Sequence, residues 1–488
     1  MTTFSLKAYR AFLRNDYASF IERCFRHLHP QSEYLPNWHI EAMAAKLDAC
    51  RRGKLLRLII NVPPRYLKSL CASVALPAWI LGRDPSAQIL CVSYAQDLAD
   101  KLARDCLLVM QADWYRELFP QTRLSKMRLA VSEFTTTRQG FRKATSVDGV
   151  LTGRGADFII IDDPLKPEEA LSDTQRNKVN TWFGNTLYSR QNDKGRGCII
   201  LIMQRLHEGD LVGHVIQQES WDLLCLPAIA QEDEEHLIET LYGAERIVRK
   251  AGEPLHVERE SLEVLNRIKQ TMGTYDFAGQ YLQAPAPLEG GIVKRKWFKF
   301  YDAEEQPEEF DRIIQSWDTA SKATELANYS VCTTWGLKGK QIYLLNVYRK
   351  QLDFPGLVRA AEDLSRQFGA EVVLVEEAAS GIQLVQQLKT KGIYGVKAVK
   401  PEGDKVMRLH AQSTAIENGF AVLPREACWL EEYLHELTTF PRSKHSDPVD
   451  STSQALAWIS DAGREPGILQ YYREEAERMR RNGQLPPV

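Results

Sequence analysis

The sequence has no cysteine spacing of the kind that builds a structural zinc site. Its nine cysteines are scattered, and none forms a Cys-x-x-Cys pair. An odd number of scattered cysteines in a long chain is typical of reduced thiols in a reducing compartment. The cysteine pattern therefore argues against both a disulfide scaffold and a zinc ribbon.

Long hydrophobic runs are also missing. The longest apolar stretches, such as 199–203 and 372–375, have the length of strands, whereas a membrane helix needs about 18 or more apolar residues. Residues 1–14 alternate apolar and polar positions and lack the apolar centre of a signal peptide. We therefore expect a protein that neither spans a membrane nor is exported.

The chain has no excess of one charge. It carries 62 Lys and Arg against 64 Asp and Glu, a net charge of −2, so any contact with nucleic acid must use a local basic patch. With 44% hydrophobic and 26% charged residues it can bury proper cores. Its 488 residues, at about 150 per domain, predict three domains or two large ones. We find no repeat with a period of 20–50 residues.

The first half alternates strand and helix patterns. An amphipathic helix over 37–52 is followed by a strand over 55–62, a helix over 69–81, and a strand over 87–93 that leads into a further helix. Apolar strands at 158–161 and 198–203 extend this series. The β-α-β-α order predicts an α/β domain with a parallel sheet.

A boundary is expected where the composition changes. Residues 230–252 are acidic and weakly patterned, and 283–291 (QAPAPLEGG) has the proline and glycine density of a linker. We therefore expect a first domain over 1–229, a connecting region over 230–291, a mixed α/β domain over 292–463 and a tail over 464–488. In the second domain the pattern predicts strands over 312–317, 330–337, 341–348 and 371–375, and helices over 355–368 and 382–391.

The first candidate site is a strand, a tight loop and a helix. The strand RLIINV runs into PPRYLKS, and a helix begins directly afterwards. This is the arrangement of a P-loop, in which backbone N–H groups hold phosphates, Lys68 reaches the β and γ phosphates and Ser69 offers a hydroxyl to Mg²⁺. The two glycines of the usual motif are missing, and Leu67 stands where the second would be. Taken alone, the segment also fits a proline-punctuated loop with a solvated lysine.

A second segment strengthens the nucleotide interpretation. Four apolar residues, 158–161, end in Asp162 and Asp163, as when a buried parallel strand delivers acids to the edge of its sheet. Asp162 would hold Mg²⁺, and Asp163 would orient or deprotonate the attacking water. The alternative is a turn, because Asp-Asp-Pro is good turn chemistry. Upstream, Arg154 lies between two glycines, which would let a loop present it to a neighbouring subunit's γ-phosphate; a surface arginine in a flexible turn is the alternative.

The second candidate site consists of acids far apart in the sequence. Asp318 ends the strand RIIQSWD, Glu376 ends EVVLVE, and Asp447 begins the helix DPVDSTSQALAWI. Converging acids without a Cys or His cluster suit oxygen-ligated divalent ions, and two such ions can clamp a phosphodiester. Asp447 could instead be a helix N-cap. Asp450, one turn further on, is then the alternative ligand.

Six segments in this order resemble the large terminase subunit of tailed bacteriophages, over about 38–459. They are PPRYLKS (often PPRHGKS in the family), TGRGADFIIIDDP, LIMQRLHEGDL, SWDTAS, VEEAASG and HSDPVDSTSQAL. The resemblance implies an additional-strand P-loop ATPase domain followed by a ribonuclease H-like nuclease domain. It also implies a motor that packages DNA into a procapsid and cuts concatemers.

The resemblance implies a role for each matching residue. Arg65, Lys68, Ser69 and Asp162 would bind ATP with Mg²⁺, and Asp163 stands at the catalytic carboxylate, commonly Glu in the family. Gln204 and Arg205 would belong to the motif that couples hydrolysis to movement. For the nuclease, two divalent ions, Mg²⁺ or Mn²⁺, would be held by Asp318, Glu376 and Asp447. Departures from the family pattern are Ser446 and Asn328, where Asp is frequent.

Partners are likewise implied by the resemblance: double-stranded DNA, the portal protein of the procapsid, a small terminase subunit, and further copies of the chain in a ring on the portal. No membrane is involved, and the place of action is the cytoplasm of the infected bacterium or lysogen. Two other functions remain as alternatives. A helicase-nuclease of DNA repair would need a second RecA-like sheet, and a catalytically silent docking component would not need the intact acids and Lys68.

Overall fold

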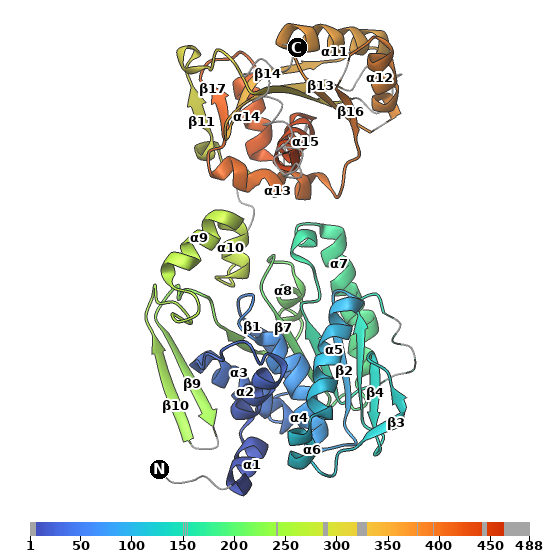
Figure 1. Ribbon diagram of the computed structural model, residues 1–488, viewed down its shortest axis with the longest axis vertical. Helices are drawn as coiled ribbons and strands as arrows, with labels where there is room; N and C mark the ends of the chain where they lie inside the picture. The colour runs from blue at the N-terminus through green and yellow to red at the C-terminus, as the bar shows by residue number, and fades with distance from the viewer. Residues whose placement is uncertain are drawn as a thin grey trace, which may run out of the picture. The chain divides into compact units, whose positions relative to one another are not determined.

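The computed structural model describes residues 6–149, 151, 153, 155–240, 243–285, 291–319, 329–377, 379–393, 395–441 and 447–462. The chain divides into two compact units, residues 1–287 and 288–488 (Figure 1). The division falls within the proline- and glycine-rich segment 283–291. None of the helices in the described ranges is long and apolar enough to cross a membrane.

The first unit is built on an eight-stranded sheet in the order β3-β4-β5-β2-β6-β7-β1-β8. Its strands are β1 (Arg57–Asn61), β2 (Gln88–Ser93), β3 (Leu124–Leu129), β4 (Glu133–Thr136), β5 (Phe141–Ser146), β6 (Phe158–Asp162), β7 (Cys198–Met203) and β8 (Asp222–Cys225). The strands from β5 to β8 in this order are parallel, and β3 and β4 form an antiparallel edge.

Strand β7 is the additional strand of this sheet, because it lies between β1 and β6 and pairs with both in parallel. Every residue of β7 is buried, which explains why its sequence CIILIM is continuously apolar rather than alternating. Since parallel strands end at the same edge, β1, β6 and β7 deliver the residues that follow them to one place.

Helices cover both faces of the sheet. They are α1 (Leu6–Asn15), α2 (Tyr17–Leu28), α3 (Trp38–Arg51), the π-helical turn η1 (Leu70–Ala75), α4 (Leu76–Arg83), α5 (Gln96–Gln111), α6 (Asp113–Leu118), η2 (Pro167–Glu169), α7 (Asp173–Trp182), η3 (Phe183–Leu187), η4 (Tyr188–Arg190) and α8 (Leu211–Val215). Helices α2 to α5 pack on the face that presents Leu58 and Ile60, and α7, η3 and α8 on the face that presents Ile59. The predicted α/β class is thereby confirmed for this unit.

The expected connecting region is mostly folded within the first unit. Residues 230–252 contain the antiparallel hairpin of β9 (Glu234–Thr240) and β10 (Gly243–Arg249), and helices α9 (Leu262–Met272) and α10 (Thr274–Gln280) follow. The hairpin carries cross-strand ion pairs, Arg249 with Glu234 at 3.3 Å and Arg246 with Glu235 at 2.5 Å. In these two strands, paired charges stand at positions where an alternation of apolar and polar residues would have indicated a strand in the sequence.

The second unit holds a seven-stranded mixed sheet in the order β11-β17-β14-β13-β12-β15-β16. Its elements are η5 (Arg295–Trp297), β11 (Lys299–Tyr301), η6 (Ala303–Glu305), β12 (Arg312–Asp318), β13 (Ser330–Lys338), β14 (Gln341–Lys350), α11 (Phe354–Phe368), β15 (Val372–Glu376), α12 (Ala379–Thr390), β16 (Val396–Val399), α13 (Lys405–Glu417), β17 (Ala421–Pro424), α14 (Leu430–Thr439) and α15 (Asp447–Ala462). Strands β12, β13 and β14 are antiparallel, whereas β15 and β16 run parallel to β12.

Two helical layers sandwich this second sheet (Figure 1). Helices α11 and α12 pack on the face of Trp317, and α13, α14 and α15 pack on the face of Trp335. Helix α11 begins at an Asp353 cap, whose side chain accepts from the Gly356 N–H at 2.8 Å, and ends at Gly369 with φ 63°. The predicted mixed α/β class is confirmed here too.

Candidate functional sites

The phosphate-loop segment adopts a glycine-like backbone without glycines. Between β1 and η1, Arg65 has φ 68° and Leu67 has φ 64°, the left-handed region that costs a residue with a Cβ roughly 1–2 kcal/mol. The loop therefore has a backbone that glycine would favour at both residues, and Leu67 stands where the usual motif has its second glycine.

Lys68 lies where three strand ends meet. Its side chain is only 6% exposed, and its Nζ is 3.1 Å from Asp163 Oδ2 and 3.4 Å from Gln204 Oε1. These two partners follow β6 and β7. The sequence-predicted residues Lys68, Asp163 and Gln204 are thus brought together, with a buried ammonium in contact with one carboxylate and one amide oxygen.

Asp162 is buried beside the start of the helix. Its carboxylate accepts hydrogen bonds from Ser69 Oγ at 3.0 Å and from Ser73 Oγ at 2.6 Å. Burial, followed by the neighbouring Asp163, raises the pKa of Asp162 to about 7, against the opposing effect of Lys68. Because a cation would stabilise this buried carboxylate, Asp162 and Ser69 fit a Mg²⁺ site. Sequence reasoning missed Ser73, although its spacing of four residues from Ser69 places both on one helical face.

Asp163 is held in an unusual backbone conformation by its neighbours. Its φ is 46°. Its N–H donates to the Ile202 carbonyl at 3.0 Å, and its carbonyl accepts from the Tyr94 N–H at 3.1 Å. A left-handed non-glycine residue fixed by two hydrogen bonds is typical of functional positions. Here it aims the carboxylate at Lys68.

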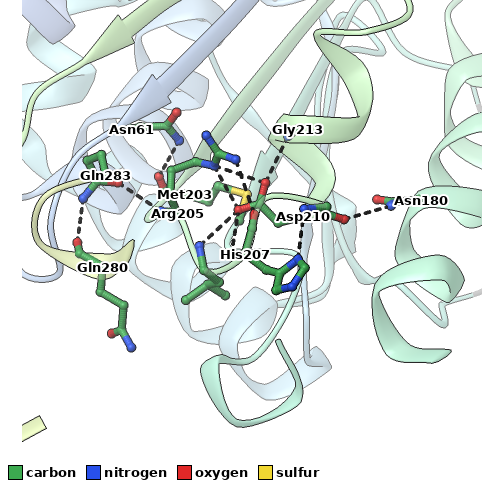
Figure 2. A network of polar contacts seen from close by, with 11 residues as sticks. Asn61, Asn180, Met203, Arg205, His207, Asp210, Gly213, Gln280 and Gln283 are labelled. Atoms are coloured by element: carbon green, nitrogen blue, oxygen red, sulfur yellow. Dashed lines mark hydrogen bonds and ion pairs between the residues drawn. The ribbon is translucent and has the colours of Figure 1, made fainter. Parts of the chain in front are cut away.

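The segment after β7 forms a compact polar network around Asp210 (Figure 2). The fully buried Asp210 carboxylate accepts from Arg205 Nε at 3.0 Å and from the Gly213 N–H at 3.0 Å, capping α8. It also accepts from the Leu206 N–H at 3.0 Å. Gln204 therefore faces Lys68, whereas its neighbour Arg205 is committed to Asp210. The sequence did not single out Asp210.

The same network reaches the end of the first unit (Figure 2). Gln283 is 5% exposed and has φ 56°. Its Oε1 accepts from the Arg205 N–H at 3.0 Å, while its Nε2 donates to the Gln280 carbonyl at 2.6 Å. Gly279 packs so closely on this loop that a Cβ there would lie 3.0 Å from the Arg205 carbonyl oxygen. Sequence reasoning placed Gln283 in a linker and missed these contacts.

In the second unit, β12 and β15 are adjacent and parallel, so their last residues, Asp318 and Glu376, lie side by side at one sheet edge. Burial raises the pKa of Asp318 well above its usual range, and Asp450 and then Glu376 raise it further. Burial also raises the pKa of Glu376. Asp318, Glu376 and Asp450 disfavour each other's charge, so a divalent cation among them would stabilise all three carboxylates.

The structure places Asp450 deeper in this site than Asp447. Asp450 is 2% exposed, whereas the side chain of Asp447 is 31% exposed and lies 3.8 Å from Arg349 Nη2. Asp447 also contributes less than Asp450 to the raised pKa of Asp318. Of the two alternatives open from the sequence, burial and electrostatics favour Asp450 as the partner of Asp318 and Glu376.

Helix α15 is fixed to the sheet next to these acids. Ser451 Oγ donates to the Ser316 carbonyl at 2.7 Å and accepts from the Thr333 N–H at 3.1 Å. Gln454 Nε2 adds a hydrogen bond to Ser316 Oγ at 3.0 Å. These contacts tie the helix to β12 and β13, and so hold Asp450 close to the end of β12.

Two basic side chains from α13 occupy the acidic site. Lys405 Nζ forms an ion pair with Asp450 Oδ2, and Arg408 Nη2 donates to Asp450 Oδ1 at 2.6 Å. Arg408 Nη2 is also 4.0 Å from Glu376 Oε2. Within the described ranges, no three Asp, Glu, His or Cys side chains are grouped so that they could hold a metal ion. The sequence did not single out Lys405 or Arg408.

Arg154, Asn328, Ser446 and the tail over 464–488 lie outside the described residues. Arg65 is described and exposed at the phosphate loop, next to the buried Tyr66.

Comparisons with known proteins give one family match and several similar solved structures. Residues 315–458 match the family described as the terminase RNaseH-like domain. The large terminase of a thermophilic bacteriophage, in its crystal form 2, has a TM-score of 0.50 at 13% identity, covering 86% of this chain and 98% of that chain. The large terminase of bacteriophage HK97 has a TM-score of 0.37 at 11% identity, covering 90% and 98%. The large terminase nuclease of thermophilic phage G20c with bound magnesium has 0.28 at 16%, covering 35% and 98%.

No curated relative matches the chain. The resemblance seen in the six sequence segments agrees with the family match over β12 to α15 and with the fold shared with the large terminase of the first thermophilic phage. Residues 315–458 of the second unit match the terminase RNaseH-like domain, and the chain shares its fold with a large terminase of known structure.

Proposed function

We propose that the chain is an ATP-driven motor that packages double-stranded phage DNA and a metal-dependent endonuclease that cuts concatemers. The observation that carries this proposal is the convergence of Lys68, Asp163 and Gln204 at one edge of a parallel sheet. The adjacent acids Asp318 and Glu376 in the second unit of the same chain supply the nuclease half. The terminase family match over residues 315–458 supports the packaging role.

In the motor, Arg65, Lys68 and Ser69 bind the phosphates of ATP, and Ser69 with Asp162 holds Mg²⁺. When bound, Mg²⁺ neutralises charge that develops on the phosphates. Lys68 exchanges its present partners for phosphate oxygens, which leaves the Asp163 carboxylate free to orient and deprotonate the attacking water. The left-handed backbone at Asp163 keeps this carboxylate in place.

Gln204 and Arg205 couple hydrolysis to movement in this proposal. Gln204 contacts Lys68, and the Arg205 backbone is bound by Gln283 at the end of the first unit. If phosphate binding displaces Lys68, the movement would pass to Gln204 and then, through the hydrogen bond between Arg205 and Gln283, to residues next to the linker. Arg154, between Gly153 and Gly155, remains our candidate for an arginine supplied to a neighbouring subunit.

In the nuclease, Asp318, Glu376 and Asp450 hold two divalent ions, Mg²⁺ or Mn²⁺, with Asp447 as the alternative third ligand. When bound, such ions activate a water and stabilise the leaving oxygen of a phosphodiester. The chain's own contribution is to hold the three carboxylates at fixed strand and helix ends and to orient α15 through Ser451.

The partners follow from this role: double-stranded DNA, the portal protein, a small terminase subunit and other copies of the chain in a ring. The place of action is the cytoplasm of the infected bacterium or lysogen. A helicase-nuclease is disfavoured because β12, β13 and β14 are antiparallel, whereas a second RecA-like sheet would be parallel. A silent docking component is disfavoured by the assembled Lys68 and Asp163 pair.

Dependence of ATP turnover on linear DNA and procapsids tests the packaging role. We expect turnover to rise when both are added together, and turnover indifferent to both would contradict it. Asparagine substitutions decide the third nuclease ligand, because Asn caps a helix about as well as Asp but ligates poorly. Asp450→Asn should abolish plasmid cleavage, and Asp447→Asn should reduce it less. The reverse order would return the ligand role to Asp447.

A further inference from the structure

Helix α13 presents two cations to the carboxylates of the proposed nuclease site. Lys405 and Arg408 are paired with the two oxygens of Asp450, and Arg408 also approaches Glu376 at 4.0 Å. Asp450 is almost fully buried, and it is one of the proposed metal ligands. The two cations therefore pair with oxygens that a metal ion would need. The acidic site therefore already contains positive charge supplied by the chain itself.

The two cations stabilise the acidic site that they contact rather than the helix on which they lie. Lys405 is the first residue of α13, and Arg408 is one turn further on. Positive charge in the first turn of a helix is unfavourable, because the N–H groups and the helix dipole there are themselves positive. The helix is capped instead by Asp404, whose side chain accepts from the Met407 N–H at 2.9 Å. Burial would lower the pKa of Lys405, but Asp450, Asp318 and Asp447 raise it above its usual value.

Both cations can be reached from solvent while their carboxylate partner cannot. The Lys405 side chain is 48% exposed and that of Arg408 is 18% exposed, against 2% for Asp450. Lysine and arginine are the side chains that bind phosphate, lysine as a point charge and arginine as a fork of donors. A DNA backbone that reaches the site would therefore compete with Asp450 for the two cations.

We propose that Lys405 and Arg408 are exchangeable counter-ions that make metal loading of the nuclease site depend on DNA. Without DNA they pair with Asp450 and Glu376 and weaken divalent-ion binding. When DNA binds, its phosphates take over the two cations, and the carboxylates become free to coordinate metal. This inference rests on the proposed nuclease function.

The coupling must be reciprocal. If DNA tightens metal binding by a given factor, the metal tightens DNA binding by the same factor. Removing the cations should therefore have two effects. The protein without DNA should bind the metal more tightly, and adding DNA should change the metal affinity less than it does in wild type. A purely structural role in holding α13 against α15 predicts neither effect.

Binding of Mn²⁺ to the full-length protein, measured by electron paramagnetic resonance of the free ion, tests the proposal. The proteins are wild type, the double variant K405Q/R408Q and K397Q, which removes an exposed lysine that lies 5.0 Å from the Trp458 ring. Each is titrated with and without a phosphorothioate duplex, and Mn²⁺ bound by the duplex alone is subtracted. D318N is titrated in parallel, and the binding that it loses defines the nuclease site.

Without DNA, we expect K405Q/R408Q to bind Mn²⁺ at least about tenfold more tightly than wild type, as is typical for removal of a close charge partner. The duplex should tighten binding to wild type and K397Q and change K405Q/R408Q little. R408K keeps the charge and should bind Mn²⁺ like wild type, with and without the duplex. Its melting temperature controls for the folding of α13.

The outcomes separate the two proposals. Equal Mn²⁺ affinity of wild type and K405Q/R408Q, with binding still lost in D318N, overturns the counter-ion role and leaves the nuclease site standing. Unchanged Mn²⁺ binding in D318N, with and without DNA, overturns the nuclease site itself. If K405Q/R408Q melts well below wild type, the single variant K405Q, at the more exposed position, gives the same comparison.

Discussion

The backbone N–H of Arg205 donates a hydrogen bond to Oε1 of Gln283, with 3.0 Å between nitrogen and oxygen. The bond joins the segment after β7, whose Gln204 contacts Lys68, to the residues that precede the linker. Gln283 is buried, and Arg205 is half-buried. In Gln283→Ala, the Arg205 N–H and the Gln280 carbonyl lose this partner, which should destabilise the segment by about 1–3 kcal/mol.

Hydrogen exchange of the peptide covering 204–210 measures this effect directly, because loss of the bond should speed exchange of the Arg205 amide. Gln231→Ala is the matched control, since Gln231 is an exposed glutamine of the same unit whose Nε2 also donates to a backbone carbonyl. If the 204–210 peptide of Gln283→Ala exchanges as fast as that of wild type, the bond contributes nothing to the order of this segment.

Loss of the Lys68 ammonium should remove most ATP turnover. We expect Lys68→Ala to lose about 2 to 4 kcal/mol of transition-state stabilisation, as for other electrostatic donors, which corresponds to a fall of roughly thirtyfold or more. Phosphate release from ATP is the measurement. Lys166→Ala, at an exposed lysine of the same unit that lies over the Tyr94 ring, is the control. Turnover by Lys68→Ala at the Lys166→Ala rate would contradict the nucleotide site.

The left-handed backbone at Leu67 predicts an unusual pattern of tolerance. Leu67→Gly relieves the backbone cost and should lower stability little, whereas Leu67→Ile, similar in volume, should destabilise by about 1 kcal/mol or more because β-branched residues fit φ near 64° poorly. Denaturant unfolding measures both. Leu55→Ile is the control, because Leu55 packs against the same core and has no positive φ. Equal losses at the two positions would argue against backbone strain.

Buried His39, which stacks edge-on against Tyr66 of the phosphate loop, should make the first unit sensitive to acid. Burial, followed by His256, lowers the pKa of His39 to about 3. The unfolded chain, with a histidine pKa near 6.5, therefore binds a proton that the folded chain excludes. Stability from this group is present above about pH 6.5 and is lost as the pH falls toward 3.

His39→Gln removes this source of acid sensitivity. Between pH 7 and pH 5, wild type should lose about 2 kcal/mol of unfolding free energy relative to His39→Gln. His27→Gln, at an exposed histidine of the same unit, controls for the loss of an imidazole. A stability difference between wild type and His39→Gln that does not change with pH would show that His39 takes up its proton in the folded state.

The parts of the fold and sites that the sequence predicted are those marked by local pattern. Apolar strands ending in acids located Asp162, Asp318 and Glu376, because a parallel strand delivers its last residue to a fixed edge. Pro355 and Gly369 bounded α11 for equally local reasons. Lys68 was found by its place between a strand and a helix.

What the sequence could not predict depends on tertiary contact. Arg65 and Leu67 have left-handed backbones without being glycines, so composition gave no hint of their conformation. The strands β9 and β10 were hidden because charge pairs such as Arg249 with Glu234 stand where apolar residues were expected. Lys405 lies 45 residues before its partner Asp450, and helix spacing carries no signal over that distance. Burial, which favours Asp450 over Asp447 as the proposed third ligand, is a property of the fold, because the two residues have the same side chain.

Mn²⁺-dependent cleavage of supercoiled plasmid by full-length Asp318→Asn, with ATP turnover measured on the same preparation, tests the central claim most directly. In the proposed function ATP hydrolysis and DNA cleavage take place at separate sites of one chain, and asparagine matches the shape of Asp318 without its charge. We predict that cleavage is abolished while ATP turnover stays at the wild-type rate. Cleavage at the wild-type rate by Asp318→Asn would contradict the account.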